Sequence, residues 1–306
     1  MVTIGIPNGL FYYEYSSMWK EFFEKLGLHV LISQDTNKRT MDTGVKYCNN
    51  ETCLPVKIFH GHVASLKDKA DYIFIPRYHS TSKDEYTCPQ ICGLPDMTAA
   101  NLGCKHKILE AKINMDVHPE ETKESLIEMA KTLKIRPSKV IEAFYEVYDK
   151  YLQSKTEENI TDLKRVDVNK GKLLLLGHPY MIYDNYLSMR LIEKLKKRNI
   201  EVFTPKDFTH EIKRKNAYPF QGKKFWNIGF ELLGSAFTSV KDKKVKGIIY
   251  LSPFACGLDA FIMEFIELRI KAKCRNVPML KLTVDEHTGE GGFDTRLEAF
   301  IDMIGV

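Results

Sequence analysis

Two cysteines stand four residues apart in the stretch EYTCPQICGLPD, which runs from residue 85 to residue 96. Pro89 follows Cys88 and Gly93 follows Cys92, so turn and helix-start signals flank both thiols. Thiols of this kind pack in a core, form a disulfide, bind zinc or bind an iron–sulfur cluster. The choice among these four depends on the other cysteines and on where the fold places them.

The seven cysteines of the chain are an odd number, scattered from Cys48 to Cys274. A small secreted domain would instead show an even number in a compact framework. The pattern therefore favours reduced thiols in a cytosol over disulfides.

The composition is that of a soluble globular protein of 306 residues, long enough for two domains, with 44% hydrophobic and 28% charged residues. The net charge of +5, from 45 basic and 40 acidic residues, is mild and does not indicate a nucleic-acid partner. The start MVTIGIPNGL lacks the features of a signal peptide, and no apolar run approaches the ~20 residues of a membrane span. We therefore expect a cytoplasmic protein that binds neither membrane nor nucleic acid.

A β-α-β pattern occurs twice along the chain. TIGIP, LHVLI and DYIFIP read as strands in the first half, and KLLLLGHP, IEVF and GIIYLSP read as strands in the second, with helical spacing between the first two strands of each half. Laid over each other without a gap, the halves match at Gly5 and Gly177, Pro7 and Pro179, and Gly27 and Asn199. We interpret this match as a structural duplication.

The predicted fold class is α/β, with two Rossmann-like parallel-sheet domains in pseudo-repeat and a helical segment that connects them. The first domain covers residues 1–115 and the second covers residues 171–306. The helical segment and a polar linker fill residues 116–170. HKILEAKI and VPMLKLTV read as the fourth strands of the two sheets.

Three cysteines are predicted to lie where open parallel sheets bind ligands, beyond the carboxyl ends of their strands. Cys88 follows the third strand of the first half, and Cys256 follows the third strand of the second half. Cys53 opens the helix after the second strand, on the same rim. Helix starts favour the thiolate, which is the ligating form. We expect these three thiols to converge on one metal centre.

The remaining cysteines are less suited to bind a metal. Cys92 is close enough to Cys88 to share a metal, but it equally suits a buried place on a first helical turn. Cys48, Cys104 and Cys274 are interpreted as core residues. The spacing is neither the paired C-x-x-C of structural zinc nor the compact bacterial ferredoxin run. Ligation by thiolates from two domains favours an iron–sulfur cluster.

Five motifs in order, from Ile4 to the C-terminus, resemble the family of 2-hydroxyacyl-CoA dehydratase-like iron–sulfur proteins, in the branch related to CoA-substrate-specific enzyme activases. They are ETCLPVKIFHGHV, DYIFIPR, CPQICGLPD, SPFACG and DEHTGEGGFDTRLEAFIDMI. The resemblance implies a cluster held between the two domains, either a four-iron four-sulfur cluster with one open iron or a double-cubane cluster. Cys53, Cys88 and Cys256 match the recurrent cysteines of the family, whereas Cys92 falls where many relatives have an apolar residue.

The resemblance also implies a separate ATP-hydrolysing activase as electron donor. The sequence has no Gly-x-x-x-x-Gly-Lys-Ser/Thr loop, so ATP chemistry is assigned to that partner. Groups near the cluster would supply protons and tune its potential. Glu51, His60 and the run Asp285, Glu286 and His287 are the candidates. Capping, surface exposure or a salt bridge between domains is the alternative role for each.

The expected function is that of an oxygen-sensitive iron–sulfur enzyme of the dehydratase or reductase type, which passes a low-potential electron to a small substrate. An acyl-CoA thioester is one candidate substrate, and the chain is expected to form a homodimer or to be one subunit of a heterodimer. Two alternatives stay open. One is a non-enzymatic electron carrier or assembly protein with the same cluster, and the other is a zinc-stabilised binding module.

Overall fold

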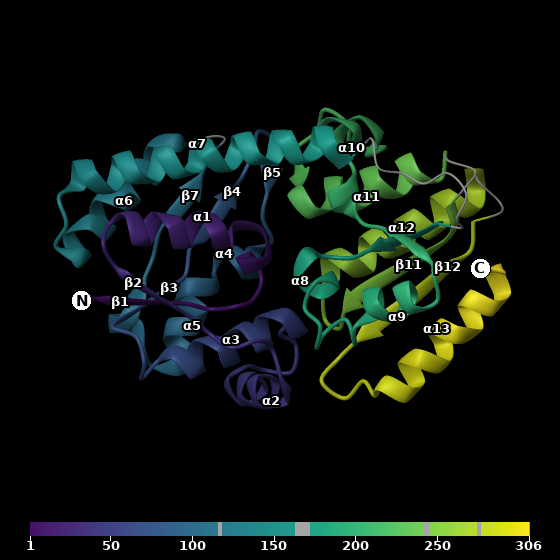
Figure 1. Ribbon diagram of the computed structural model, residues 1–306, viewed down its shortest axis with the longest axis horizontal. Coiled ribbons are helices and arrows are strands. Elements are labelled where there is room, and N and C mark those ends of the chain that lie inside the picture. Colours follow the sequence, from purple (N-terminus) through teal and green to yellow (C-terminus); the bar gives the residue numbers. More distant parts are fainter. Residues whose placement is uncertain (116–117, 163–171, 242–244, 274–276, 306) are drawn as a thin grey trace. The chain divides into compact units, whose positions relative to one another are not determined.

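The computed structural model divides the chain into two compact units, each with its own parallel sheet (Figure 1). Unit 1 is Met1–Glu157 and unit 2 is Glu158–Val306. The structure describes residues 1–115, 118–162, 172–241, 245–273 and 277–305. The mixed α/β class with parallel sheets confirms the predicted fold class.

Unit 1 is built on a four-stranded parallel sheet in the order β2-β1-β3-β6. Its strands are β1 Thr3–Ile6, β2 His29–Ile32, β3 Tyr72–Phe74, β4 Arg77–Ser80, β5 Glu85–Tyr86, β6 Ile108–Leu109 and β7 Lys112–Asn114. Its helices are α1 Tyr12–Lys25, α2 Lys38–Tyr47, α3 Leu54–Leu66, α4 Pro89–Cys92, α5 Leu94–Leu102 and α6 Pro119–Leu133, with a 3-10 turn at Lys105–Lys107 and α7 Pro137–Asp162, which continues past the unit boundary.

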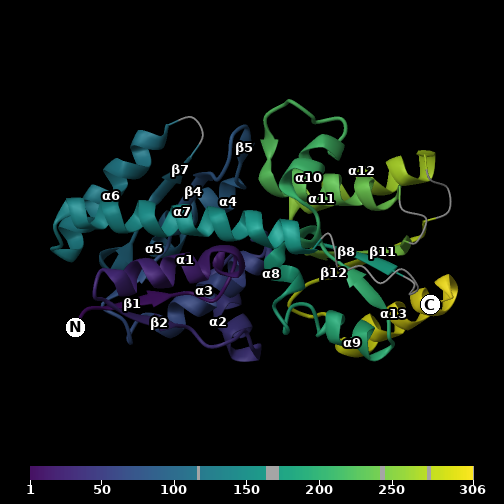
Figure 2. The same ribbon diagram turned by 45° about the horizontal axis from the view of Figure 1, so that its top comes forward.

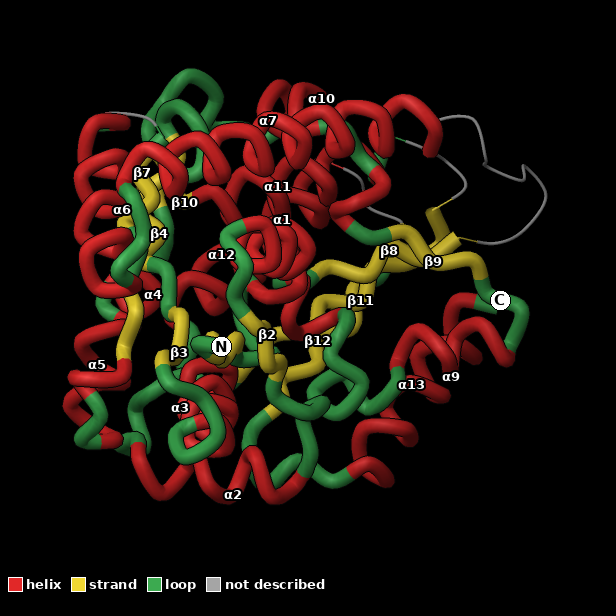
Figure 3. Tube along the Cα trace, turned by 60° about the vertical axis from the view of Figure 1, so that its left-hand side comes forward, coloured by secondary structure: helices red, strands yellow, loops and turns green. Residues whose placement is uncertain are grey.

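Helices cover both faces of this sheet (Figures 1 and 3). On one face, α1 packs with α6 and α7 in a single apolar cluster that includes Trp19, Phe22 and Phe144. On the other face lies α3, whose Leu66 contacts Gly5 of β1, with α2 and α5 packed against α3. The helices after residue 115 thus bury their apolar faces in the core of unit 1, as expected for elements stabilised by burial.

Unit 2 repeats the topology of the first sheet. Its strand order β12-β11-β8-β9 reads backwards as β9-β8-β11-β12, the same crossover pattern as β2-β1-β3-β6, and all its strands are parallel. The strands of unit 2 are β8 Lys172–Leu176, β9 Glu201–Phe203, β10 Phe225–Trp226, β11 Val245–Pro253 and β12 Met279–Val284. Its helices are α8 Pro179–Ile182, α9 Leu191–Lys197, α10 His210–Asn216, α11 Asn227–Ser239, α12 Gly257–Lys273 and α13 Glu290–Ile304, with a 3-10 turn at Pro205–Asp207.

The second sheet lies between two helical layers, with α11 and α12 on one side and α9 and α13 on the other (Figure 2). Leu174 and Leu176 of β8 face the cluster formed with α11 and α12. Leu173 and Leu175 point to the opposite face, and all four leucines are fully buried. A run of four leucines is therefore what a strand covered on both faces requires.

Two sequence interpretations change in detail. The polar segment predicted as a linker begins as helix, because α7 extends through Asp162, and residues 163–171 lie outside the described residues. The third and fourth strands of unit 1 each break and continue as a second parallel pair, β4 with β7, after Pro76 and Ala111. Their counterparts β11 and β12 run on without a break.

Candidate functional site

Cys53 and Cys88 each occupy the residue directly before a helix. Cys53 precedes α3 and Cys88 precedes α4, both with extended backbone and a proline within the first two helical residues. The Cys53 thiol donates to Oε1 of Gln90 at 3.3 Å, and Gln90 is the second residue of α4. The loops that carry the two cysteines therefore meet at this side chain.

Arg77, the first residue of β4, holds α4 in place. Its Nη1 donates to the carbonyl oxygen of Cys92 at 2.8 Å, and its other nitrogens pair with Glu110 and with Asp96. The Cys92 sulfur lies 3.5 Å from Nε2 of His79, and burial raises the pKa of the Cys92 thiol. Cys92 is thus held beside the rim of the sheet with a nitrogen donor next to it.

An apolar cavity of about 40 Å³ opens beyond the carboxyl ends of β1 and β3. Ile6, Leu10, Trp19 and Ile75 are among its walls, and so is Ile91 of α4, which stands between Cys88 and Cys92 in the sequence. Cavities at this place in parallel sheets commonly bind ligands. The rim of unit 1 therefore offers a small hydrophobic pocket, lined in part by the helix that follows Cys88.

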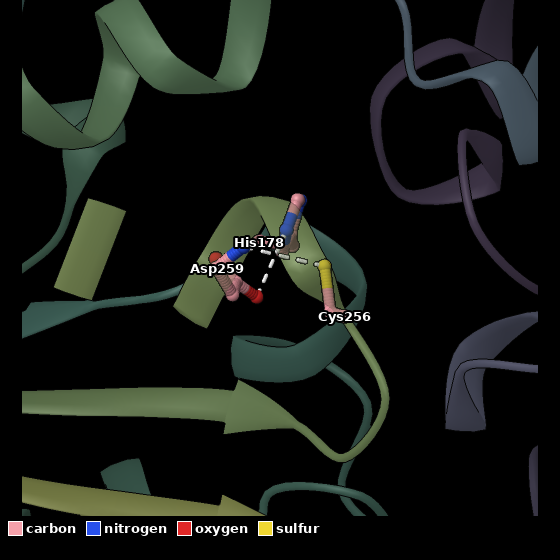
Figure 4. A group of neighbouring side chains, drawn as sticks. All are labelled: His178, Cys256 and Asp259. Atoms are coloured by element: carbon pink, nitrogen blue, oxygen red, sulfur yellow. Dashed lines mark hydrogen bonds and ion pairs between the residues drawn. The ribbon is translucent and has the colours of Figure 1, made fainter. Parts of the chain in front are cut away.

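Unit 2 gathers three donor side chains beyond the ends of β8 and β11 (Figure 4). His178 lies two residues beyond the end of β8 and directly precedes α8. Cys256 directly precedes α12, and Asp259 lies in the first turn of that helix. One donor atom from each residue lies within 4.8 Å of the others.

Local contacts hold these three side chains in place. Nε2 of His178 lies 3.0 Å from Oδ2 of Asp259, and the Tyr250 hydroxyl donates to Oδ1 of the same carboxylate at 2.7 Å. The backbone N–H of Asp259 donates to the Cys256 sulfur at 3.5 Å, which caps the start of α12. The His178 ring also stacks on Tyr180 with 4.7 Å between ring centroids.

The charges in this group follow from burial and pairing. Burial by itself lowers the pKa of His178, but the neighbouring Asp259 carboxylate and Cys256 outweigh it and raise that pKa to about 10. Burial raises the pKa of the Cys256 thiol, although the hydrogen bond with His178 opposes the rise. At neutral pH the group is therefore an imidazolium–carboxylate pair beside a protonated thiol.

Two of the predicted proton-handling residues lie in unit 1. Glu51 is exposed in the turn before α3. His60 is fully buried within α3, where its ring nitrogens lie 2.8 Å from the carbonyl oxygen of Val56 and 3.2 Å from Nδ2 of Asn101. Burial lowers the pKa of His60, so this ring is neutral at pH 7.

The run Asp285–Glu286–His287 forms a turn between β12 and α13 in unit 2. Oδ1 of Asp285 accepts from the hydroxyl of Thr288 at 2.7 Å and from the backbone N–H of His287 at 2.9 Å. These hydrogen bonds lower the pKa of Asp285, Glu286 is half-buried, and His287 is exposed. The contacts are those of an Asx turn, and a catalytic role for the three residues stays a prediction.

Cys53, Cys88, Cys92 and Cys256 are partly buried and form no disulfide among the described residues, and Cys104 is fully buried, as expected of a core residue. Cys48 is free and half-buried, and Cys274 lies outside the described residues. The predicted convergence of Cys53 and Cys88 with Cys256 joins residues of different units and stays a prediction.

Sequence reasoning missed His178 and Asp259. His178 stands just beyond a strand, in the sequence GHP, and Asp259 follows Cys256 by three residues at a helix start. Both are local signals of a strand-end site. Their proximity, however, depends on the pairing of β8 with β11.

The chain was compared with known proteins. The comparison with curated proteins found no match. Similar solved structures include a zinc-bound mutant of AdcAII from Streptococcus pneumoniae, with 12% identity and a TM-score of 0.31, covering 100% of this chain and 98% of that one. Another is the laminin-binding adhesin Lmb from Streptococcus agalactiae, with 12% identity, a TM-score of 0.32, and coverage of 100% and 98%. A third is the laminin-binding protein Lbp of Streptococcus pyogenes, with 11% identity, a TM-score of 0.30, and coverage of 99% and 97%. TM-scores this low support no conclusion about this chain.

Among the described helices, none has the length and apolar character needed to cross a bilayer. A family model matches residues 3–208, which include unit 1 and the first strands and helices of unit 2 up to β9. The match spans well over half of the chain. The chain therefore belongs to the CoA enzyme activase uncharacterised domain family.

Proposed function

We propose that this chain is an iron–sulfur protein of the 2-hydroxyacyl-CoA dehydratase type, with Cys53, Cys88 and Cys256 as cluster ligands. One observation carries the proposal. Each of the three thiols is outside any disulfide of the described residues, partly buried and placed directly before a helix at the carboxyl rim of a parallel sheet. The two sheets share one strand topology, and Cys88 follows β4, the continuation of the third strand of unit 1, as Cys256 follows β11, the third strand of unit 2.

The donor set fits such a cluster. Cysteine thiolates are the usual ligands of iron–sulfur clusters, and a bound metal displaces the proton of a thiol whose pKa is raised by burial, as that of Cys256 is. Cys92 offers a further thiol beside Cys88, with His79 next to it. When bound, a cluster with three protein thiolates leaves one iron open to a substrate and transfers single electrons.

The other residues of unit 1 would position the ligands and the substrate. Gln90 accepts a hydrogen bond from Cys53 and so orients that sulfur, while Arg77 holds α4 in place. The apolar cavity behind Ile91 suits a short apolar group of a small substrate, with an acyl-CoA thioester as the candidate. Glu51 is the exposed carboxylate nearest to Cys53 in sequence and is proposed to exchange protons there, with His60, Asp285, Glu286 and His287 as further candidates.

The proposed partner is an ATP-hydrolysing activase that delivers low-potential electrons. The family to which the chain belongs is named for CoA enzyme activases. The sequence lacks a phosphate-binding Gly-x-x-x-x-Gly-Lys-Ser/Thr loop, which supports an electron donor on a separate chain. The chain would then act in the cytoplasm, where such donors operate and thiols stay reduced.

The test is to count iron and acid-labile sulfide in protein purified without oxygen. About four irons per chain indicate one cubane cluster and about eight indicate a double-cubane cluster. Cys53→Ser, Cys88→Ser and Cys256→Ser should each lose or alter the cluster. Cys104→Ser, at a fully buried thiol away from the proposed ligands, is the matched control and should keep the iron content of the parent. Equal iron in all four variants would disprove the ligand assignment.

Turnover separates the enzyme from an electron carrier. With an activase, ATP and a series of acyl-CoA thioesters, an enzyme reoxidises its reduced cluster only when a substrate is present. A reduced cluster that persists with every thioester offered would favour the carrier.

A further inference from the structure

His178, Cys256 and Asp259 supply one nitrogen, one sulfur and one oxygen donor within 4.8 Å of one another (Figure 4). All three residues belong to unit 2, and they come from two segments that the β8–β11 pairing brings together. Imidazole, thiolate and carboxylate are the three ligand types that zinc takes in proteins. Three protein ligands with one open position are also the donor count of a catalytic zinc site.

Two of these donor atoms are buried and pair with each other as imidazolium and carboxylate. They are Nε2 of His178 and Oδ2 of Asp259, which face each other at 3.0 Å. His178 is 4% exposed and Asp259 is 0% exposed. Buried polar atoms need partners, and a cation that takes the place of the proton between this nitrogen and this oxygen would be ligated by both.

The remaining atoms already support a ligand role. Oδ1 of Asp259 accepts from Tyr250, which leaves Oδ2 directed at His178. A partner of this kind, one shell outside the metal, orients a ligating carboxylate. Zinc lies ~2.0–2.3 Å from such donors, which places the donors themselves ~3.5 Å apart in a tetrahedral site. The three donor atoms would therefore need to shift only slightly, since they already lie within 4.8 Å of one another.

We propose that His178, Cys256 and Asp259 bind a single divalent cation of the zinc type, within unit 2 and without Cys53 or Cys88. This site goes beyond the proposed cluster and shares one residue with it. Because Cys256 belongs to both ligand sets, zinc in this site and a cluster on Cys256 exclude each other. Zinc bound here would block cluster assembly, and an assembled cluster would prevent zinc binding.

The experiment uses the full chain, stripped of metal by a chelator under reducing conditions and titrated with Zn²⁺ against a chromophoric competitor. The parent should bind one zinc ion per chain. His178→Gln and Asp259→Asn should each weaken zinc binding about tenfold to a hundredfold or more, since even outer-shell changes have effects of that size. Tyr250→Phe, which removes only the outer hydrogen bond, should weaken it about tenfold. Cys53→Ser and Cys88→Ser are the matched controls and should bind zinc like the parent.

The same variants, reconstituted with iron and sulfide without oxygen, give the reverse pattern. Cys53→Ser and Cys88→Ser should lose iron and keep zinc, His178→Gln and Asp259→Asn should lose zinc and keep iron, and Cys256→Ser should lose both. Prior loading with zinc should reduce iron uptake by the parent.

The zinc site is disproved if the parent binds no zinc, if His178→Gln and Asp259→Asn bind it with parental affinity, or if Cys53→Ser loses it. Absence of iron from a parent that binds zinc would instead disprove the cluster alone. Circular dichroism of each variant checks its folding, and Tyr250→Phe keeps the zinc test decisive if a ligand variant does not fold.

Discussion

The two sheets differ in the side chain found at, or just beyond, the end of the first strand. Ile6 closes β1 and lines an apolar cavity, whereas His178, its counterpart in the ungapped overlay of the two halves, is charged and paired with Asp259. Both residues are almost completely buried. The two halves thus carry buried side chains at matching positions of the overlay, Ile6 within β1 and His178 just beyond β8, and their chemistry decides whether an apolar group or a cation is attracted.

The histidines near the two rims show the same contrast. In unit 1, His62 lies between the hydroxyls of Ser33 and Thr36 at 3.0 Å each, and burial lowers its pKa to about 4. In unit 2, the carboxylate of Asp259 keeps His178 charged to about pH 10. The rim of unit 1, which is apolar, therefore contains a neutral histidine bonded to hydroxyls. The rim of unit 2, which has side chains able to bind a metal, contains a buried ion pair.

The largest expected effect comes from breaking the ion pair of unit 2. Asp259→Ala leaves the His178 imidazolium buried without its partner and removes the acceptor of the Tyr250 hydroxyl. Loss of one partner of a buried pair costs about 3–5 kcal/mol in the free energy of unfolding. Urea unfolding of metal-free protein, followed by circular dichroism, measures this loss.

Asp285→Ala is the control for Asp259→Ala, because Asp285 is a carboxylate of the same unit that caps a turn by accepting from Thr288 and His287. Its loss should cost only about 1 kcal/mol, like the loss of a helix cap. If Asp259→Ala and Asp285→Ala lost the same free energy of unfolding, the contacts of Asp259 would stabilise unit 2 no more than those of a turn do.

The second expected effect is that His178 and His62 contribute to the free energy of unfolding with opposite dependence on pH. The pKa of His178 is raised above the ordinary ~6.5 of an unfolded chain, so its contribution is complete below pH ~6.5 and is lost as the pH rises toward 10. The pKa of His62 is lowered, so its contribution is present above pH ~6.5 and is lost as the pH falls toward 4.

Stability against pH, measured by urea unfolding of His178→Gln and His62→Gln, tests both signs. The His178 variant should lose less stability than the parent between neutral and alkaline pH, and the His62 variant should lose less between neutral and acid pH. If His178→Gln lost as much stability as the parent between neutral and alkaline pH, Asp259 would not be keeping this ring protonated.

Much of the fold follows from the sequence because the first and third strands of both sheets are short apolar runs that end at or near a proline or glycine. The run of four leucines in β8 predicts a strand covered on both faces, and Cys104 is buried as expected. The helix α2 escaped notice because it is mostly polar. Its start at Asn37, whose side chain accepts from the backbone of Thr40 at 3.1 Å, was nevertheless a readable cap.

The candidate site could be predicted only in part. Cys53 and Cys88 each precede a helix whose start is recognisable in the sequence, because a proline occupies one of its first two positions. The contact of His178 with Asp259 joins residues 81 positions apart (259 − 178) and exists only because β8 pairs with β11. The apolar cavity is a space that side chains from several elements leave unfilled. Packing of this kind depends on the tertiary structure and cannot be seen in a local sequence pattern.

The smallest expected effect concerns the two matching helix ends. Gly27 follows α1 with φ +81°, and Asn199 follows α9 with φ +56°, so both adopt the left-handed conformation at the same point of the repeat. A Cβ added at Gly27 would meet no atom within 4 Å, so only the backbone conformation opposes a side chain there. Gly27→Ala should therefore cost about 1–2 kcal/mol, whereas Gly27→Asn should cost less, because Asn adopts this conformation more readily. Asn199→Gly should change the free energy of unfolding by no more than about 0.5 kcal/mol. If Gly27→Asn were as costly as Gly27→Ala, the two helix ends would not be interchangeable, and the equivalence between Ile6 and His178 would lose its nearest structural support.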